Sequence, residues 1–211
     1  MINYDGKNDF KAQQSVSFDA LPVGFYVGKI LGAKVETIDT QSGSFDRLAL
    51  QIDVAEGEHA NHYRKQYEAQ SGGSYPAKFK GIVRISIPVK GSQYEATQKR
   101  ILENMAWALE QSNKGYHWDW DETKLKGLSV GFTVREFDWC MERDGGLAYG
   151  TSTEIGRLDS VEDARSGKLK PMKKRELREA DKEKLQRYQE TMAIAEENGM
   201  TPLAADEELP F

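Results

Sequence analysis

The sequence predicts a mainly β fold with helices, in which five strands close into a small Greek-key barrel. Three observations predict it. Strand-forming stretches recur five times between residues 23 and 158, and one helix-period stretch separates the third from the fourth. The first stretch is also long and interrupted by glycine. A barrel needs such a strand, because one strand must bend far enough to pair on both sides of the closure.

The first predicted strand covers residues 23–39 and is rich in Val, Ile, Phe, Tyr and Thr, which favour strands. It is long, since strands usually have about five or six residues. Its apolar phase changes beside Gly28 and Gly32, so that Val27 and Ile30 fall on opposite faces. We expect a bulge or sharp bend there, because glycine lets the backbone turn. Two separate short strands are the alternative.

The second and third strands are predicted at about residues 48–54 and 82–89, where apolar side chains occupy every second position. That period is typical of half-buried antiparallel strands. The intervening residues 59–81 show no sustained period and contain Gly72, Gly73 and Pro76. They are therefore interpreted as a long loop with at most a short strand at 63–67.

A helix is predicted after the third strand. Ser92 and Glu95 have the spacing of a capping box, in which two side chains satisfy each other's backbone N–H groups. The sequence around Gly115 supplies a C-terminal stop. Between them runs an apolar stripe at helical spacing, which we expect to pack on the sheet. Its residues are Ile101, Leu102, Met105, Ala106 and Leu109.

The last two strands are predicted at about residues 128–135 and 147–158, with a hairpin sequence at 144–146. After them, Asp159 or Ser160 can cap a short helix that ends at a glycine. A narrow apolar stripe then indicates a charged, mostly solvated helix that ends at the glycine before the C-terminal tail.

The predicted order is strand, strand, strand, helix, strand, strand, which fits a barrel of the OB type. We divide the chain into an N-terminal arm (1–20), an OB-like domain (21–158), a helical extension (159–198) and an acidic tail (199–211). Other small barrels and α+β sheets fit this order less well.

The composition excludes several classes. The net charge is −5, which argues against a uniformly basic protein, and the single cysteine, Cys140, excludes an intrachain disulfide and a CxxC-type zinc site. No signal peptide is visible, and no stretch approaches the roughly 18 apolar residues of a membrane helix. We expect a cytoplasmic protein, in the host cytoplasm if a phage encodes it.

Positive charge and aromatic rings concentrate in residues 60–100, where eight Lys and Arg face only two acids, a net charge of +6. Single-stranded nucleic acid requires this combination, because cations neutralise phosphates and flat rings stack on unpaired bases. The alternative is a solvated loop whose rings pack into the core. The predicted DNA-binding residues are Arg47, Tyr63, Arg64, Lys65, Tyr67, Tyr75, Lys78, Phe79, Lys80 and Arg84.

The opposite charge gathers in residues 196–211, which hold five acids and no Lys or Arg. An acidic stretch that ends in an apolar tip can dock in a partner's groove. The alternative is an ordinary acidic tail. The predicted partner-binding residues are Asp206, Glu207, Glu208, Leu209, Pro210 and Phe211.

Residues 206–211 resemble the C-terminal tip of bacterial and phage single-stranded-DNA-binding proteins. The body separately resembles a phage-encoded family of such proteins, in Pro22–Ile30, Leu48–Gly57, Lys124–Gly127 and Arg165–Pro171. The resemblance implies a DNA-binding barrel and a tip that recruits replication or recombination proteins, and it is compatible with a homo-oligomer. The chain departs from the bacterial pattern, because a charged helical segment replaces the Gly/Gln-rich linker before the tip.

Catalytic patterns are scarce. There is no P-loop and no G-x-S-x-G sequence, and we expect neither enzymatic activity nor a cofactor. His59 and His62, with two nearby glutamates, are weak evidence for a metal. The function predicted is sequence-tolerant binding of single-stranded DNA. The alternatives are a protein-interaction adaptor that barely touches DNA, and a small metal-dependent nuclease at His59 and His62.

Overall fold

The computed structural model describes residues 19–40, 43–71, 76–143 and 146–197. The fold is mainly β with helices, as predicted. The strands are β1 (Gly24–Thr40), β2 (Gly43–Val54), β3 (Ile82–Ser86), β4 (Ser129–Arg143) and β5 (Gly146–Asp159). The helices are α1 (His62–Gln70), α2 (Glu95–Ser112), the short 3-10 helix η1 (Glu122–Leu125), α3 (Val161–Ser166) and α4 (Glu179–Glu197).

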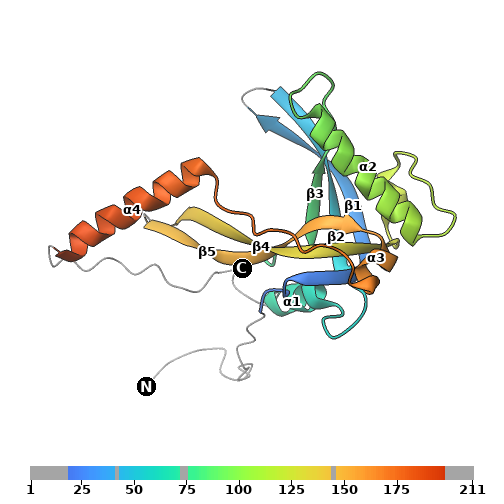
Figure 1. Cartoon of the computed structure of the whole chain (residues 1–211), viewed down its shortest axis with the longest axis horizontal. Coiled ribbons are helices and arrows are strands. Elements are labelled where there is room, and N and C mark those ends of the chain that lie inside the picture. The colour runs from blue at the N-terminus through green and yellow to red at the C-terminus, as the bar shows by residue number, and fades with distance from the viewer. Residues whose placement is uncertain (1–18, 41–42, 72–75, 144–145, 198–211) are drawn as a thin grey trace, which may run out of the picture.

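The five strands form one antiparallel sheet in the order β3-β2-β1-β4-β5 (Figure 1). β1 lies at its centre, because its first part pairs with β4 and most of its length pairs with β2. The register between β1 and β2 shifts between Ile30 and Gly32. The predicted single long strand with a bulge near Gly28 and Gly32 is therefore confirmed, and the bulge leaves Leu31 as the extra residue.

The predicted closure into a barrel is wrong. β3 and β5 remain the two edges of an open sheet. β1 pairs with β4 only as far as Val134, whereas β4 and β5 stay paired up to Arg143 and Gly146. The far part of that pair, residues 135–143 and 146–154, is called the β4–β5 ribbon below. It extends away from the rest of the sheet (Figure 1), so this length of β5 cannot pair with β3.

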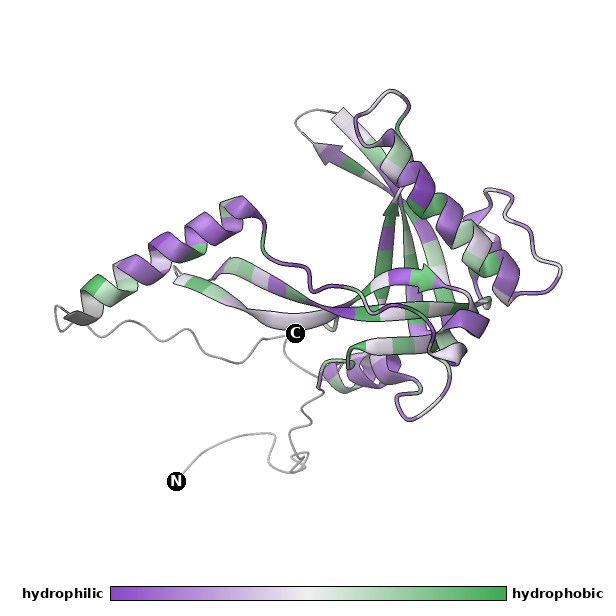
Figure 2. Ribbon diagram, viewed as in Figure 1, coloured by the Kyte–Doolittle hydropathy of each residue, from purple (hydrophilic) through white to green (hydrophobic). Residues whose placement is uncertain are grey.

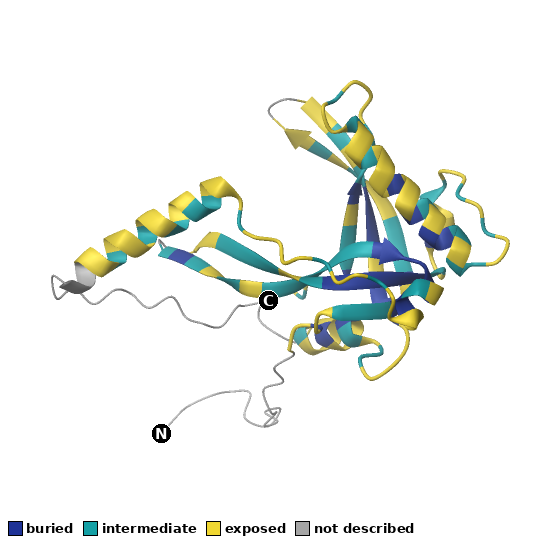
Figure 3. Ribbon diagram, in the orientation of Figure 1, coloured by how far each residue is buried: buried dark blue, intermediate teal, exposed yellow. Residues whose placement is uncertain are grey.

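The core lies between α2 and the sheet, and β2, β4 and α2 contribute many of its buried side chains (Figure 3). The alternating residues of β2 predicted to face inward, such as Leu50 and Ile52, are fully buried. The helical stripe is buried at Leu102, Met105 and Leu109, but Ile101 is 45% exposed and does not belong to it. The N-terminus of α2 also differs from the capping box, because Glu95 accepts a hydrogen bond from the backbone of Gly91 (2.6 Å).

The long loop predicted at residues 59–81 is wrong, because α1 occupies its first half. The two C-terminal helices agree better with prediction. Ser160 caps α3, and Gly167 ends it in the left-handed conformation. The largely hydrophilic α4 (Figure 2) lies beside the end of the β4–β5 ribbon, where Lys184 pairs with Glu142 (2.6 Å).

Candidate nucleic-acid interface

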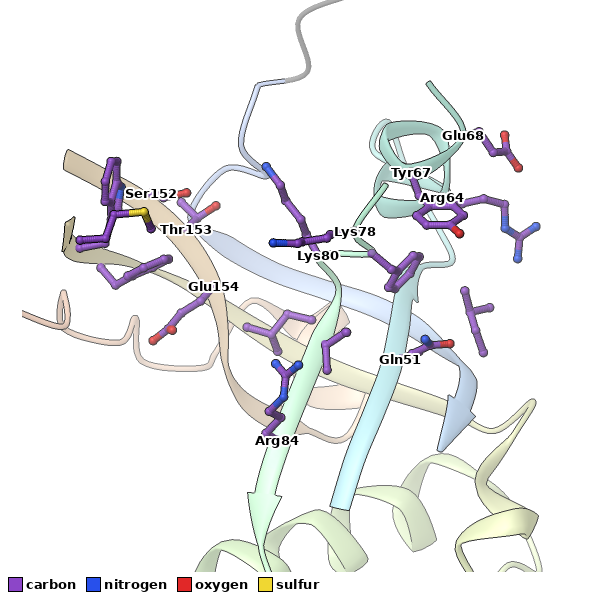
Figure 4. A pocket seen from close by; sticks show the side chains of 17 residues that line it. Gln51, Arg64, Tyr67, Glu68, Lys78, Lys80, Arg84, Ser152, Thr153 and Glu154 are labelled. Atoms are coloured by element: carbon purple, nitrogen blue, oxygen red, sulfur yellow. The ribbon is translucent and has the colours of Figure 1, made fainter. Parts of the chain in front are cut away.

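A groove of about 950 Å³ separates the β4–β5 ribbon from α1, β2 and β3 (Figure 4). We call it the central groove. One wall comes from the body of the sheet and α1: Leu31, Gln51, Arg64, Tyr67, Glu68, Lys78, Phe79, Lys80, Ile82 and Arg84. The other wall comes from the ribbon and the adjoining end of β5: Phe137, Trp139, Met141, Ser152, Thr153, Glu154 and Ile155.

The helix α1 is fixed to the sheet by the buried carboxylate of Asp53 on β2. Its Oδ1 accepts a hydrogen bond from the backbone N–H of Tyr63 (2.9 Å), and its Oδ2 accepts one from Arg64 (3.1 Å). A carboxylate satisfies the free N–H groups at a helix N-terminus and is favoured by the helix dipole. This anchor sets α1 against β2, with Arg64 and Tyr67 among the groove-lining residues.

The segment that joins α1 to β3 runs close to the sheet because residue 81 is glycine. A Cβ atom on Gly81 would lie 2.2 Å from the Ile52 carbonyl oxygen and 2.5 Å from the ring of Tyr63, so no other residue fits. Phe79 consequently packs between two rings, with centroids 6.1 Å from Tyr63 and 6.2 Å from Tyr67. The segment therefore gives the groove one ring and two cations, Lys78 and Lys80 (Figure 4).

The ribbon wall carries three large apolar side chains that the sequence interpretation missed. Phe137, Trp139 and Met141 occupy alternate positions of β4 and line the same groove. Alternation puts them on one face of the ribbon. Their alternation is a strand signal that the sequence contains. It lies beyond residue 135, where the sequence pattern predicts the end of the strand.

The groove has more positive than negative charge. Among the described residues, four cations line it, Arg64, Lys78, Lys80 and Arg84, against the two carboxylates Glu68 and Glu154. Burial lowers the pKa of Lys80, since desolvation disfavours its ammonium form. An anion beside Lys80 would relieve that cost.

Glu154 is held by two arginines. Its carboxylate oxygens lie 2.9 Å from Nη2 of Arg135 and 2.8 Å from Nη2 of Arg175. Arg175 is itself fixed by backbone hydrogen bonds to Glu136 and Asp138 on the edge of β4 (2.9 Å each). Burial raises the pKa of Glu154, but its bonds to both arginines outweigh this and hold the pKa below its usual value.

Six of the ten predicted DNA-binding residues meet in the central groove: Arg64, Tyr67, Lys78, Phe79, Lys80 and Arg84. Arg47 lies elsewhere on β2 and donates a hydrogen bond to Glu36 (2.9 Å). Tyr63 is a core residue, 6% exposed, and burial raises the pKa of its hydroxyl. Lys65 is exposed on α1 but does not line the groove. Tyr75 and residues 206–211 lie outside the described residues.

The two histidines considered for metal binding take part in aromatic contacts. The ring centroid of His59 lies 6.0 Å from that of Tyr26, and that of His62 lies 5.2 Å from that of Tyr63. Burial lowers the pKa of His62, which favours its neutral form. Within the described ranges, no three His, Cys, Asp or Glu side chains form a group that could hold a metal ion.

No protein-family model matches the sequence, and no curated protein matches it. In the part of the chain that the structure describes, no helix combines the length and apolar character needed to cross a bilayer.

Proposed function

We propose that the protein binds single-stranded DNA in the central groove, without strong sequence preference. The observation that carries the proposal is that, within the described part of the chain, four cations and four aromatic rings surround one groove. The rings are Tyr67 and Phe79 on the body wall, and Phe137 and Trp139 on the ribbon wall.

The distribution of these groups suits an unpaired strand. The four cations named above belong to the body wall, whereas the ribbon contributes rings, Met141, hydroxyl groups and the carboxylate of Glu154, which Arg135 and Arg175 neutralise. Phosphates would follow the body wall, and bases would turn toward the rings. Stacking on such rings is sequence-tolerant because every base has a π-face, and it contributes about 1–3 kcal/mol per base. Bases stacked inside a duplex are not available for it.

The connectivity of the sheet adds support for an OB-type arrangement. In such a fold the strand 2–3 face and the loops around it bind oligonucleotides, and the barrel is partly open. Here the central groove lies on β2 and β3, and the connection between β4 and β5 is lengthened into its second wall. We interpret the sheet as an opened OB fold in which the ribbon replaces part of the missing closure.

The biological setting follows from the family resemblance of the sequence. A phage protein of this kind would cover single-stranded DNA during replication or recombination. Its C-terminal tip, Asp206–Phe211, would recruit partner proteins. An acidic segment with an apolar aromatic end suits a basic-rimmed hydrophobic pocket on such a partner.

A fluorescence titration with oligo-dT at two salt concentrations tests the proposal, with a duplex of the same length as the competitor. We expect quenching of Trp and Tyr emission, weaker binding at high salt, and little competition from the duplex. A protein-interaction adaptor would show no quenching at either salt concentration. A nuclease would shorten the oligonucleotide when divalent metal is added. Either result would overturn the proposal.

A further inference from the structure

A second groove, of about 640 Å³, lies between the edge strands β3 and β5. We call it the seam groove. It adjoins the central groove, since Ile82, Arg84, Glu154 and Ile155 line both. Its other lining residues are Val83, Ile85, Arg100, Ile101, Asn104, Met105, Arg135, Gly156, Arg157, Leu158, Met172 and Arg175.

The seam groove differs chemically from the central groove. None of the described residues that line it is aromatic, so a nucleic-acid base would find no ring to stack on. Its apolar surface is aliphatic instead, and includes Ile101, a large side chain that α2 leaves 45% exposed. Aliphatic pockets of this kind suit the side chains of a peptide.

The charge of the seam groove selects for an acidic ligand. Of the residues that the structure describes, five arginines and one glutamate line it, a net charge of +4 in a chain whose net charge is −5. Arg135 and Arg175 share Glu154, and Arg157 pairs with Asp159 (2.6 Å). Arg84 lies 3.7 Å from Glu36, and Arg100 is exposed on α2. The latter two can reach a bound carboxylate without breaking a short ion pair.

Backbone groups complete the site. β3 and β5 approach each other yet form the two edges of the sheet, with no ladder between them. Among the described residues, no backbone hydrogen bond occupies the outer edge of Val83–Ser86. A free edge of this kind pairs with an extended chain, since its N–H and C=O groups are already aligned.

We propose that the seam groove binds an extended acidic peptide from a partner protein, which pairs through its backbone with the free edge of β3. Alternate side chains of the peptide would enter the groove, because successive residues of a strand point to opposite sides. Aliphatic residues would therefore alternate with Asp or Glu. This surface shares Arg84 with the central groove but differs from it at Arg100 and Ile101, which line the seam groove alone.

The test uses the full-length protein and a fluorescein-labelled octapeptide in which Asp and Glu alternate with Val and Ile. Fluorescence anisotropy should show saturable binding. Two N-methylated versions of the peptide, each with every second amide blocked, should differ in their affinity for the protein. The version that blocks the amides facing β3 should lose binding, while the opposite phase should keep it, because only one set of N–H groups pairs with the edge.

Two neighbouring residues of α2 provide a matched pair of variants. Arg100→Glu should weaken peptide binding about tenfold or more, because it places a carboxylate in the site. Lys99→Glu makes the same charge change outside the groove and should alter affinity by less than about twofold. Ile101→Asp should act like Arg100→Glu. All three side chains are exposed, so the fold should survive, which thermal unfolding would verify.

Several outcomes would overturn the proposal. The peptide could fail to bind, or bind Arg100→Glu as well as the parent. If Arg100→Glu weakens oligo-dT binding as much as peptide binding, the seam belongs to the nucleic-acid path. If it dissociates a dimer in sedimentation velocity, the occupant is a second copy. If peptide binding appears only after Asp206→Asn, Glu207→Gln and Glu208→Gln, the occupant is the chain's own tail.

Discussion

Trp139 packs directly against Gly150, its partner residue across the β4–β5 ribbon. A Cβ atom on Gly150 would lie 3.0 Å from Cζ2 of Trp139 and 3.2 Å from Cε2. Contacts this short force one neighbour to move. Because residue 150 has no side chain, the indole of Trp139 can occupy the position in which it lines the central groove.

The first prediction follows from this contact. Trp139→Ala should weaken oligo-dT binding about tenfold or more, because a stacking ring is lost. Gly150→Val should weaken it to a smaller extent by displacing the ring. The change is measured by anisotropy of a labelled oligonucleotide. Tyr149→Ala is the matched control, since Tyr149 is 50% exposed on the ribbon but does not line the groove.

The double variant decides whether Gly150 acts through Trp139. If it does, Gly150→Val should cost nothing further once Trp139 is alanine, because the two effects share one ring. If Gly150→Val lowers DNA affinity equally in the parent and in Trp139→Ala, the two residues are not coupled. If Trp139→Ala binds oligo-dT as tightly as the parent, the ribbon is not part of the interface.

The second prediction uses adjacent cations on α1. Arg64 lines the central groove, whereas Lys65 does not. If Arg64 meets a phosphate, Arg64→Ala should lower the slope of log affinity against log salt by about 0.7. Lys65→Ala removes the same charge one residue away and should leave the slope nearly unchanged. Equal changes in the two variants would show that only overall charge matters.

The position of α1 explains why its sequence has the pattern of a loop. Its residues show only weak helical periodicity, and its N-terminus is capped by Asp53, which precedes Tyr63 by ten residues. A cap supplied by another element leaves no local signal at the usual N-cap position. The cationic and aromatic residues were nevertheless recognised, because composition does not depend on knowing the element that carries them.

Strand patterns predicted the number, order and inward faces of the strands, but not the open edges. Alternation in β2 and β4 indicates which side chains are buried, as at Ile52 and Phe132. It carries no information on whether β3 meets β5. Whether the two edge strands meet depends on how far β4 and β5 continue beyond the last residue paired with β1. The sequence pattern does not indicate that length, so it could not predict the ribbon wall of the groove.

The third prediction concerns Glu154 and pH. Its pKa in the folded protein is lowered, so its bonds to Arg135 and Arg175 stabilise the fold above the usual carboxyl pKa of 4.5. That stabilisation is lost as the pH falls through the lowered pKa, because the carboxyl is then protonated in both states. Glu154→Gln should therefore lower the free energy of unfolding at pH 7 by about 1 kcal/mol, a modest value because Arg175 is partly exposed.

Urea unfolding at pH 7 and at about pH 3 checks this, since the cost should be smaller at the lower pH. Glu136→Gln is the control, because Glu136 is an exposed carboxylate on β4, the strand that pairs with the strand of Glu154. An equal cost at both pH values would mean that Glu154 contributes through packing and not through charge.

The last prediction joins the acidic tail to the central groove. Residues 196–211 carry five acids, and four cations line the groove, so the tail should compete weakly with DNA at high effective concentration. Replacing Asp206, Glu207 and Glu208 by their amides should raise oligo-dT affinity at low salt, where the Debye length is long, and change it little at high salt.

Phe211→Ala keeps the charge and should leave DNA affinity unchanged, but it should abolish pull-down of a partner replication protein, because the anchor is one aromatic ring. If the three amide changes leave DNA affinity the same at every salt concentration, the tail does not compete with DNA, although it could still recruit a partner. If Phe211→Ala still captures the partner, the tip does not recruit it, and the resemblance at the tip has no functional basis.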